Sequence, residues 1–277
     1  MLTAKRGMNL GMLKLSRGMG RTGWLSGTAL GGIGATVVLT VPQLALANPT
    51  DGHVTAGNVN IVTVSPNQLD IVQSSKKAII NWGDFSIGSG ETTNFLQPGR
   101  NSWTLNRVTG GNPSAILGSL NANGNVLLLN QNGILFGPNS KIDVGGLVAS
   151  TANIKDTDFL NDRFRFEDAP QGSTVINQGH ITVAEGGLAA LVAPGVANSG
   201  VIEAKLGHVS LASGTAFTLD LYGDGLVSLA LNGEVTQAPN GSALVSNDGR
   251  ITADGGRVLL TAEAAKGVVD SVINSRA

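Results

Sequence analysis

Three segments of the chain repeat the pattern N-x-G-x-I-x-(A/V), and each is followed by glycine and a short apolar strand. The copies span residues 177–183, 198–204 and 247–253. The first two begin 21 residues apart, which is close to one turn of a β-solenoid. The third begins 49 residues after the second, so we expect a degenerate coil between them, formed by Phe217–Leu221 and Leu226–Leu231. Asn and Gly accept the left-handed backbone that sharp corners need.

The stretch from Asn121 to Thr151 has a similar organisation. Two apolar strands, Val126–Leu129 and Ile134–Phe136, flank the polar corner Asn130–Gly133. Strands this short, separated by Asn and Gly, are typical of a chain that coils repeatedly in one direction and not of one that reverses in long hairpins. We therefore expect an all-β protein built as a β-solenoid.

Composition determines what the core of such a solenoid contains. Of 277 residues, 42% are hydrophobic and only 4% aromatic, so Val, Ile, Leu and Ala must fill most of the core. The 39 glycines suit many tight turns, and the apolar fraction is too high for a disordered chain. The chain has no cysteine, which excludes disulfides and thiolate metal sites and is compatible with passage through an oxidising periplasm.

The first 47 residues have the features of a secretory signal peptide. Five basic residues precede a run without charge from residue 22 to 50, and no acidic residue occurs before Asp51. The run contains Ala45-Leu46-Ala47, a small-x-small form that signal peptidase accepts, so we expect the mature chain to begin at Asn48. The alternative is an uncleaved membrane anchor, because the run is long enough to span a bilayer. Several glycines and Pro42 within the run favour cleavage.

Removal of this segment would leave 13 basic and 19 acidic residues, a net charge of −6. A nucleic-acid-binding protein needs a basic face, and the sequence has no basic patch after residue 47. We therefore expect no nucleic-acid partner.

Two segments of the mature chain depart from the coil pattern. His53–Asn94 is expected to start the solenoid and to cap its first coil, whose core and edge would otherwise be exposed. Lys155–Asp168 is rich in charge, and its alternation Arg163-Phe164-Arg165-Phe166 predicts one strand of a projecting hairpin. Both segments are expected to lie outside the regular coils.

We expect residues 48–277 to form one domain, with the cap at about residues 48–94. The one plausible helix of the mature chain lies around Ala262–Val269, where Gly267 interrupts it. Asn274-Ser275 resembles the start of another N-x-G corner, which indicates a fragment of a longer protein or a truncated reading frame.

An ordered series of motifs lies between Trp82 and Thr151. In chain order the motifs are WGDFSIG (82–88), NFLQP (94–98), LNRVTG (105–110), SxILG (114–118), NG (123–124), NQNGILFG (130–137) and GGLVAST (145–151). Together they resemble the secretion domain of two-partner-secretion exoproteins, which are of the filamentous haemagglutinin and high-molecular-weight adhesin type and carry an N-terminal haemagglutination activity domain. The resemblance covers roughly residues 48–277.

The resemblance implies a right-handed parallel β-helix with an N-terminal cap and extrahelical β elements. It also implies export by the general secretory machinery into the periplasm. There, the POTRA repeats of an outer-membrane β-barrel transporter would recognise the chain, which would then be secreted or displayed at the cell surface. Relatives carry adhesive, haemolytic or toxin functions in downstream regions, so contacts with host cell or matrix surfaces are expected beyond this chain.

The corner Asn130–Ile134 is the candidate for recognition by the transporter. The family usually has NPNG(I/V) here; Gln131 replaces the proline, whereas Asn130, Asn132, Gly133 and Ile134 are retained. A second family motif, NPNL, is absent, and NFLQ at residues 94–97 occupies the comparable region, as in the adhesin-like branch. The corner has a simpler interpretation as a β-turn alone, because Asn-Gly is a strong turn pair wherever it occurs.

A carbohydrate-active enzyme is the alternative function, because parallel β-helices include polysaccharide lyases and hydrolases. Such enzymes need clustered carboxylates, often with calcium or a basic residue. The sequence offers Asp156 with Asp158, interpreted as part of a solvated loop, and Asp220 with Asp224, interpreted as turn residues. Three histidines, at positions 53, 180 and 208, have no metal-ligand spacing and are expected at corners or on the exterior. We expect no catalytic, cofactor-binding or metal site.

Overall fold

The computed structural model describes residues 48–221, 228–239, 243–269 and 271–275, whose strands form three long sheets and one short one. Sheet I contains β1 (His53–Ala56), β4 (Lys77–Trp82), β6 (Trp103–Val108), β9 (Asn125–Leu129), β12 (Gly146–Ser150), β17 (Leu188–Ala193), β20 (His208–Ser213) and β25 (Arg257–Ala262). Sheet II contains β2 (Val59–Ser65), β3 (Gln68–Gln73), β5 (Thr92–Leu96), β8 (Ser119–Ala122), β11 (Lys141–Val144), β16 (His180–Val183), β19 (Val201–Glu203) and β24 (Arg250–Thr252). Sheet III contains β7 (Ser114–Ile116), β10 (Ile134–Phe136), β15 (Thr174–Asn177), β18 (Gly195–Asn198), β23 (Val245–Asn247) and β26 (Ile273–Ser275).

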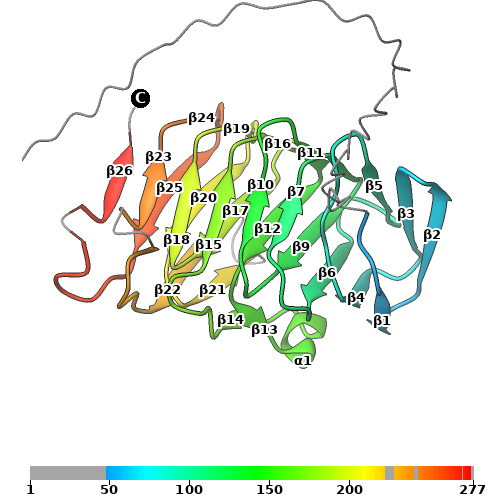
Figure 1. Ribbon diagram of the computed structural model, residues 1–277, viewed down its shortest axis with the longest axis horizontal. Coiled ribbons are helices and arrows are strands. Elements are labelled where there is room, and N and C mark those ends of the chain that lie inside the picture. Colours follow the sequence, from blue (N-terminus) through cyan, green and yellow to red (C-terminus); the bar gives the residue numbers. More distant parts are fainter. Residues whose placement is uncertain (1–47, 222–227, 240–242, 270, 276–277) are drawn as a thin grey trace, which may run out of the picture. The chain divides into compact units, whose positions relative to one another are not determined.

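The chain visits these sheets in a fixed order. From β6 onwards it passes from sheet I to sheet III, then to sheet II, and returns to sheet I one coil later. Strands of successive coils pair in parallel, so that Leu105 lies beside Leu127 and Ala149 beside Leu191. Figure 1 shows the strands side by side in chain order, from blue to red. The predicted parallel β-helix is confirmed.

Two excursions leave the helix at the corner between sheet I and sheet III. The first excursion, residues 151–173, contains β13 (Asn153–Ile154), α1 (Asp156–Leu160) and β14 (Phe164–Glu167). The second follows β20 and contains β21 (Ala216–Asp220) and β22 (Ser228–Gly233). Antiparallel pairing joins them in sheet IV, with strand order β13-β14-β21-β22, along one side of the helix (Figure 1). The extrahelical strand expected at residues 163–166 corresponds to β14.

The interval of 49 residues in the repeat contains no additional coil. Asn198 and Asn247 are direct neighbours in sheet III, and most of the intervening residues belong to the second excursion. The predicted degenerate coil is therefore wrong. Phe217 lies between Phe166 and Leu231 in the antiparallel sheet IV and does not stack in the helix. Residues 226 and 227 of that prediction lie outside the described residues.

The interior of the helix is an apolar core with few aromatic residues. Trp82, Phe85, Phe95 and Phe136 fill its early coils, and each is almost fully buried. From Ile142 onwards this core contains only Val, Ile, Leu and Ala. The expectation from composition therefore holds for its later coils.

A second core lies between the outer face of sheet I and the excursions. Ten outward-facing residues of sheet I pack there, and the aromatic part comes mainly from the excursions. The sheet residues are Ile79, Trp103, Leu105, Leu127, Leu129, Val148, Leu188, Ala190, Val192 and Ala212, and the excursion aromatics are Phe159, Phe164, Phe166 and Phe217. As a result, β12 and β17 are buried along their whole length. Sheet I thus has near-continuous apolar strands, as is usual for a parallel sheet covered on both faces.

The repeated N-x-G corners stack in register. The Nδ2 of Asn177 donates to Oδ1 of Asn198 at 2.8 Å, and Nδ2 of Asn198 donates to Oδ1 of Asn247 at 2.6 Å. In the next coil Ser275, and not Asn274, lies beside Asn247. The glycines of the motif also stack, and a Cβ on Gly200 would lie 2.2 Å from the carbonyl oxygen of Gly179. Glycine occupies this position of each corner because the main chains of neighbouring coils approach too closely for a side chain.

Antiparallel strands stand at the N-terminal edges of sheets I and II. β1 pairs with β4, and β2 pairs with β3, whereas the later strands of both sheets pair in parallel. Val59 and Ile61 of β2 pack against the inner core. The antiparallel capping strands are β1 and β2. β3 and β4 already pair in parallel with β5 and β6, so the expectation that all of residues 53–94 lie outside the regular coils is wrong.

The helix predicted around Ala262–Val269 is absent. Glu263 and Ala265 instead donate backbone hydrogen bonds to Ser213 and Val235, so this segment continues to pair with neighbouring chain. Within the described residues the one α-helix is α1, in the first excursion, with two acidic residues in its first turn. Carboxylates at that end of a helix interact favourably with its dipole.

Candidate functional site

The corner Asn130–Ile134 connects β9 of sheet I to β10 of sheet III. It lies at the same corner of the helix from which both excursions leave, one coil before the first of them. Its neighbours are therefore the simple turn of the previous coil, residues 109–113, and the first excursion in the next coil. This position determines what each side chain of the corner contacts.

Asn130 is a buried structural residue. Its side chain is 1% exposed, and its Nδ2 donates to the carbonyl oxygen of Asn112 at 2.9 Å and to Oγ of Ser114 at 3.0 Å. Its Oδ1 accepts from the backbone N–H of Asn132 at 2.9 Å, which is the hydrogen bond of an Asx turn. Asn130 thus holds the corner against the preceding coil.

Gly133 and Ile134 complete the turn and begin the next strand. The N–H of Gly133 donates to the carbonyl oxygen of Asn130 at 3.1 Å, which closes a β-turn. Gly133 has a φ of 114°, a region that a residue with a Cβ rarely adopts. Ile134 is 2% exposed and packs into the inner core. These two residues therefore offer little surface to a partner.

Gln131 and Asn132 are the exposed side chains of the corner. Gln131 Nε2 donates to the carbonyl oxygen of Asp168 at 2.8 Å, at the end of the first excursion. Asn132 Nδ2 donates to the carbonyl oxygen of Gly110 at 2.9 Å, in the previous corner. Both residues line a pocket of about 380 Å³. Its other lining residues are Arg107, Val108, Thr109, Gly110, Leu129, Ala152 and Asn153.

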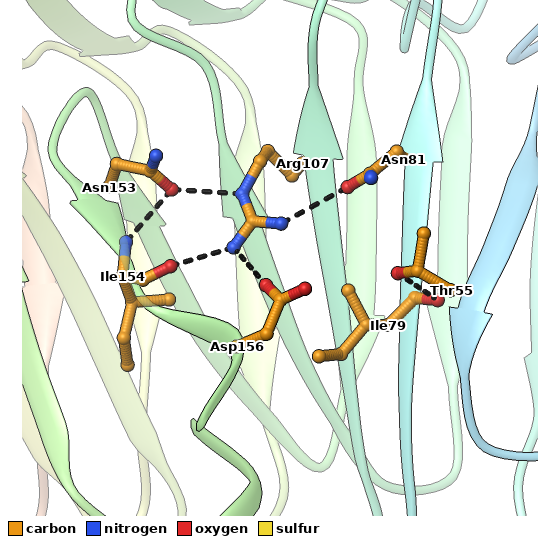
Figure 2. A network of polar contacts seen from close by, with 7 residues as sticks. All are labelled: Thr55, Ile79, Asn81, Arg107, Asn153, Ile154 and Asp156. Carbon is orange, nitrogen blue, oxygen red and sulfur yellow. Dashed lines mark hydrogen bonds and ion pairs between the residues drawn. The ribbon is translucent and has the colours of Figure 1, made fainter. Parts of the chain in front are cut away.

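Arg107 connects this pocket to the first excursion (Figure 2). Its guanidinium donates to Oδ1 of Asn153 at 2.9 Å and to the carbonyl oxygen of Ile154 at 2.7 Å, and it lies 2.7 Å from a carboxylate oxygen of Asp156. On the other side it donates to Oδ1 of Asn81 at 3.1 Å. Arg107 is outward-facing on β6 and its side chain is only 15% exposed. Sequence reasoning did not single it out, although the motif LNRVTG contains it.

Lys77 makes a second polar attachment of the excursion to sheet I. Its Nζ donates to the carbonyl oxygens of Phe159 at 2.8 Å and Leu160 at 3.1 Å, and it lies 2.6 Å from a carboxylate oxygen of Asp162. The ammonium group also lies 5.5 Å from the ring centre of Phe159, a favourable cation–π distance. Lys77 and Arg107 thus attach the excursion to strands two and three coils earlier in the chain.

The first of the two carboxylate pairs considered for catalysis has structural contacts. Asp156 and Asp158 lie in the first turn of α1 and not in a solvated loop as predicted, and they pair with Arg107 and Arg163. Asp220 ends β21, and Asp224 lies outside the described residues. Among the described residues no three His, Asp or Glu side chains are grouped so that they could hold a metal ion.

The histidines are dispersed over the β-helix. His53 and His180 are exposed, on β1 and β16. His208 begins β20 and is half-buried, and its Nδ1 has no hydrogen-bond partner. Burial lowers the pKa of His208 below its ordinary value, and the neighbouring Arg257 lowers it further. The neutral imidazole is therefore favoured, and the histidines do not form a common site.

The residues proposed for signal cleavage are only partly described. Ala45 and Ala47 lie outside the described residues, whereas Asn48 is included. Asn48 Oδ1 accepts a hydrogen bond from Oγ1 of Thr93 at 3.0 Å, so the start of the expected mature chain is attached to β5. In the part of the chain that the structure describes, no helix has the length and apolar character needed to cross a membrane.

Gly133→Val should lower the free energy of unfolding by roughly 1–3 kcal/mol, because valine is strained at positive φ and its Cβ would lie 3.3 Å from the carbonyl oxygen of Thr174. Gln131→Pro should cost less, since within the described residues the N–H of Gln131 donates no hydrogen bond. Thermal unfolding of the two variants measures the difference. Equal melting temperatures would contradict the positive-φ argument.

Comparisons with known proteins agree with this fold and these motifs. The chain matches the family described as "TPS secretion domain" over residues 45–277. It is 34% identical over 216 residues to a heme/hemopexin-binding protein of Haemophilus influenzae, covering 74% of this chain and 23% of that protein. Another heme/hemopexin-binding protein of the same species is 35% identical over 123 residues, which cover 44% of this chain and 13% of that protein.

A solved structure is also similar. The crystal structure of the HMW1 secretion domain from Haemophilus influenzae matches with a TM-score of 0.70 and 30% sequence identity, over 83% of this chain and 57% of that chain. This chain spans less than a quarter of the curated relatives that it matches. Proteins with such a domain are secreted or surface-associated and have an outer-membrane transporter as their partner. The chain belongs to the TPS secretion domain family, the secretion domains of two-partner-secretion exoproteins.

Proposed function

We propose that this chain is the N-terminal export module of a large adhesin-like exoprotein. We also propose that the transporter of this exoprotein recognises the exposed side of the Asn130–Ile134 corner. The general secretory machinery delivers the chain to the periplasm, where the POTRA repeats of the outer-membrane β-barrel bind it. Adhesive or other contacts with host surfaces belong to parts of the exoprotein outside this chain. The carbohydrate-active enzyme finds no support in the family match or in the solved structure.

The observation that carries this proposal is that three residues of the corner are buried and form the turn, whereas the other two are exposed. Asn130, Gly133 and Ile134 have their polar groups and surface used internally, so they explain the turn. Gln131 and Asn132 are exposed beside a pocket that also contains Arg107. In strand addition, main-chain hydrogen bonds supply affinity and pockets for side chains supply specificity. The pocket beside these two exposed amides can accept a side chain of an extended partner segment.

Secretion of the double variant Gln131→Ala/Asn132→Ala tests this recognition. In cells carrying the cognate transporter, we expect it to be secreted at least tenfold less than the unchanged chain, while the purified variant folds. The matched control is Gln178→Ala/Ser199→Ala, which alters exposed residues at another corner of the helix. If the first variant folds and is secreted as well as the control, the corner is only a turn and recognition lies elsewhere.

Processing at residue 47 is a separate prediction. The basic region, the uncharged run and Ala45-Leu46-Ala47 together support a cleaved signal peptide. Sequencing the N-terminus of exported protein should yield Asn-Pro-Thr-Asp, beginning at Asn48. Recovery of the chain in a membrane fraction with residues 1–47 intact would favour the membrane anchor instead.

A further inference from the structure

Strands β4, β6 and β9 of sheet I come earlier in the chain than the residues that cover their outer face. Ile79, Trp103, Leu105, Leu127 and Leu129 lie on β4, β6 and β9, and they are buried in one cluster with residues of the two excursions. All of sheet IV comes later in the chain, from β13 onwards. A chain that is delivered from its N-terminus therefore exposes a continuous apolar face until its first excursion has docked.

Two cations border this face. Lys77 and Arg107 point to the same side of sheet I as Ile79 and Leu105, as the strand register shows. Apart from Asn81, the polar groups that they contact all belong to the first excursion: the carbonyl oxygens of Ile154, Phe159 and Leu160, Oδ1 of Asn153, and the carboxylates of Asp156 and Asp162. Before docking, the face thus combines apolar side chains with two cations whose acceptors have not yet arrived.

We propose that this face is a transient docking surface for an extended segment of the transporter's periplasmic domain, and that the first excursion is a built-in competitor that displaces it. This inference rests on the proposed export function. Charge complementarity defines the occupant: an apolar strand flanked by carboxylates, which would meet Lys77 and Arg107 as the excursion does. The excursion supplies the same combination, with Ile154, Phe164 and Phe166 on short strands and Asp156 and Asp162 beside the cations.

Competition for one surface explains how the transporter segment is released from the chain without a further factor. The partner strand and the excursion cannot occupy the face together, so docking of the excursion ends the contact. Docking is favoured because it buries three phenylalanine side chains, Phe159, Phe164 and Phe166, and gives both cations their hydrogen-bond acceptors. The transporter would then hold the early coils until the first excursion docks on them.

The test measures binding of the mature chain to the immobilised periplasmic domain of the cognate transporter. Phe164→Ala/Phe166→Ala loosens the excursion, and we expect it to bind at least tenfold more tightly than the folded unchanged chain. Asp156→Asn/Asp162→Asn is a milder variant that keeps side-chain size, and it should bind about threefold more tightly. Adding Lys77→Gln/Arg107→Gln to either variant should remove the gain, and a peptide of residues 152–168 should compete with the periplasmic domain.

Val183→Ala is the control, because Val183 packs in the inner core and not under the excursion. An equal gain with this variant would mean that general loosening creates binding, and the proposal would be wrong. It would also be wrong if the excursion variants bind no better than the unchanged chain, or if they only associate with a second copy of themselves. Unchanged chain freshly diluted from urea separates the two proposals: if it too fails to bind, the export function itself fails.

Discussion

Gly200→Ala should lower the free energy of unfolding by about 3 kcal/mol, at the upper end of the usual effect of overpacking. The added Cβ would lie 2.2 Å from the carbonyl oxygen of Gly179, and 2.6 Å and 2.8 Å from backbone atoms of Gln178 and Gly179. These neighbours are main chain, so no side-chain rotation can relieve the contact. For a chain of this size, the melting temperature should fall by roughly 6–12 °C in a thermal unfolding experiment.

Gly99→Ala is the matched control for this prediction. Gly99 lies in a turn, no atom lies within 4 Å of the position of its Cβ, and its φ is not in the left-handed region. Its replacement should change the melting temperature by less than about 2 °C, as for most surface substitutions. Similar losses for the two variants would contradict the close stacking of corners as the reason for glycine at position 200.

Asn198→Ala should destabilise the protein by about 2–4 kcal/mol, because it removes the middle member of the buried asparagine ladder. The Nδ2 of Asn177 and Oδ1 of Asn247 would lose their partners, and an unsatisfied buried polar group costs about 1–3 kcal/mol. The remaining acceptors near Asn177 Nδ2 lie at 3.4 Å and 3.5 Å, too far to compensate. Denaturant unfolding monitored by circular dichroism gives the free energy.

The outer face of sheet II provides an internal comparison for this ladder. Asn121 donates to Oδ1 of Asn94 at 2.9 Å, in the same kind of side-chain stack, but both residues are partly exposed. Water can replace this hydrogen bond, so Asn121→Ala should cost at most about 1 kcal/mol. If the two substitutions cost the same, burial does not explain the effect of the ladder.

The coils were predictable because their corners repeat a local requirement. Each N-x-G corner needs an asparagine amide inside and a glycine where two main chains meet, and this requirement appears directly in the sequence at positions such as Asn177 and Gly179. The excursions were harder, because an apolar strand has the same pattern in either sheet. Phe217–Leu221 alternates as a coil strand would, and only its antiparallel partner Phe166, about 50 residues earlier, places it in sheet IV.

The sequence was enough to predict that the candidate site is a turn, but not which residues of neighbouring coils its side chains contact. Asn132-Gly133 indicates a tight corner by itself, and Gly133 has the positive φ that such a corner needs. The burial of Asn130 depends on Asn112 and Ser114 of the previous coil, and the contact of Gln131 depends on Asp168 of the next. In the sequence, nothing distinguishes Arg107 from other basic residues. Its role appears only in the fold, where the first excursion places Asp156 beside it.

The two separate cores also give the described chain a pair of natural optical probes. Trp82 lies in the inner core, against the edge of Phe85, whereas Trp103 lies in the second core beside Phe164. Replacement of either tryptophan by phenylalanine leaves one indole within the described residues. Its emission then reports the stacking of the first coils or the docking of the excursion, and the order of the two events becomes measurable in time.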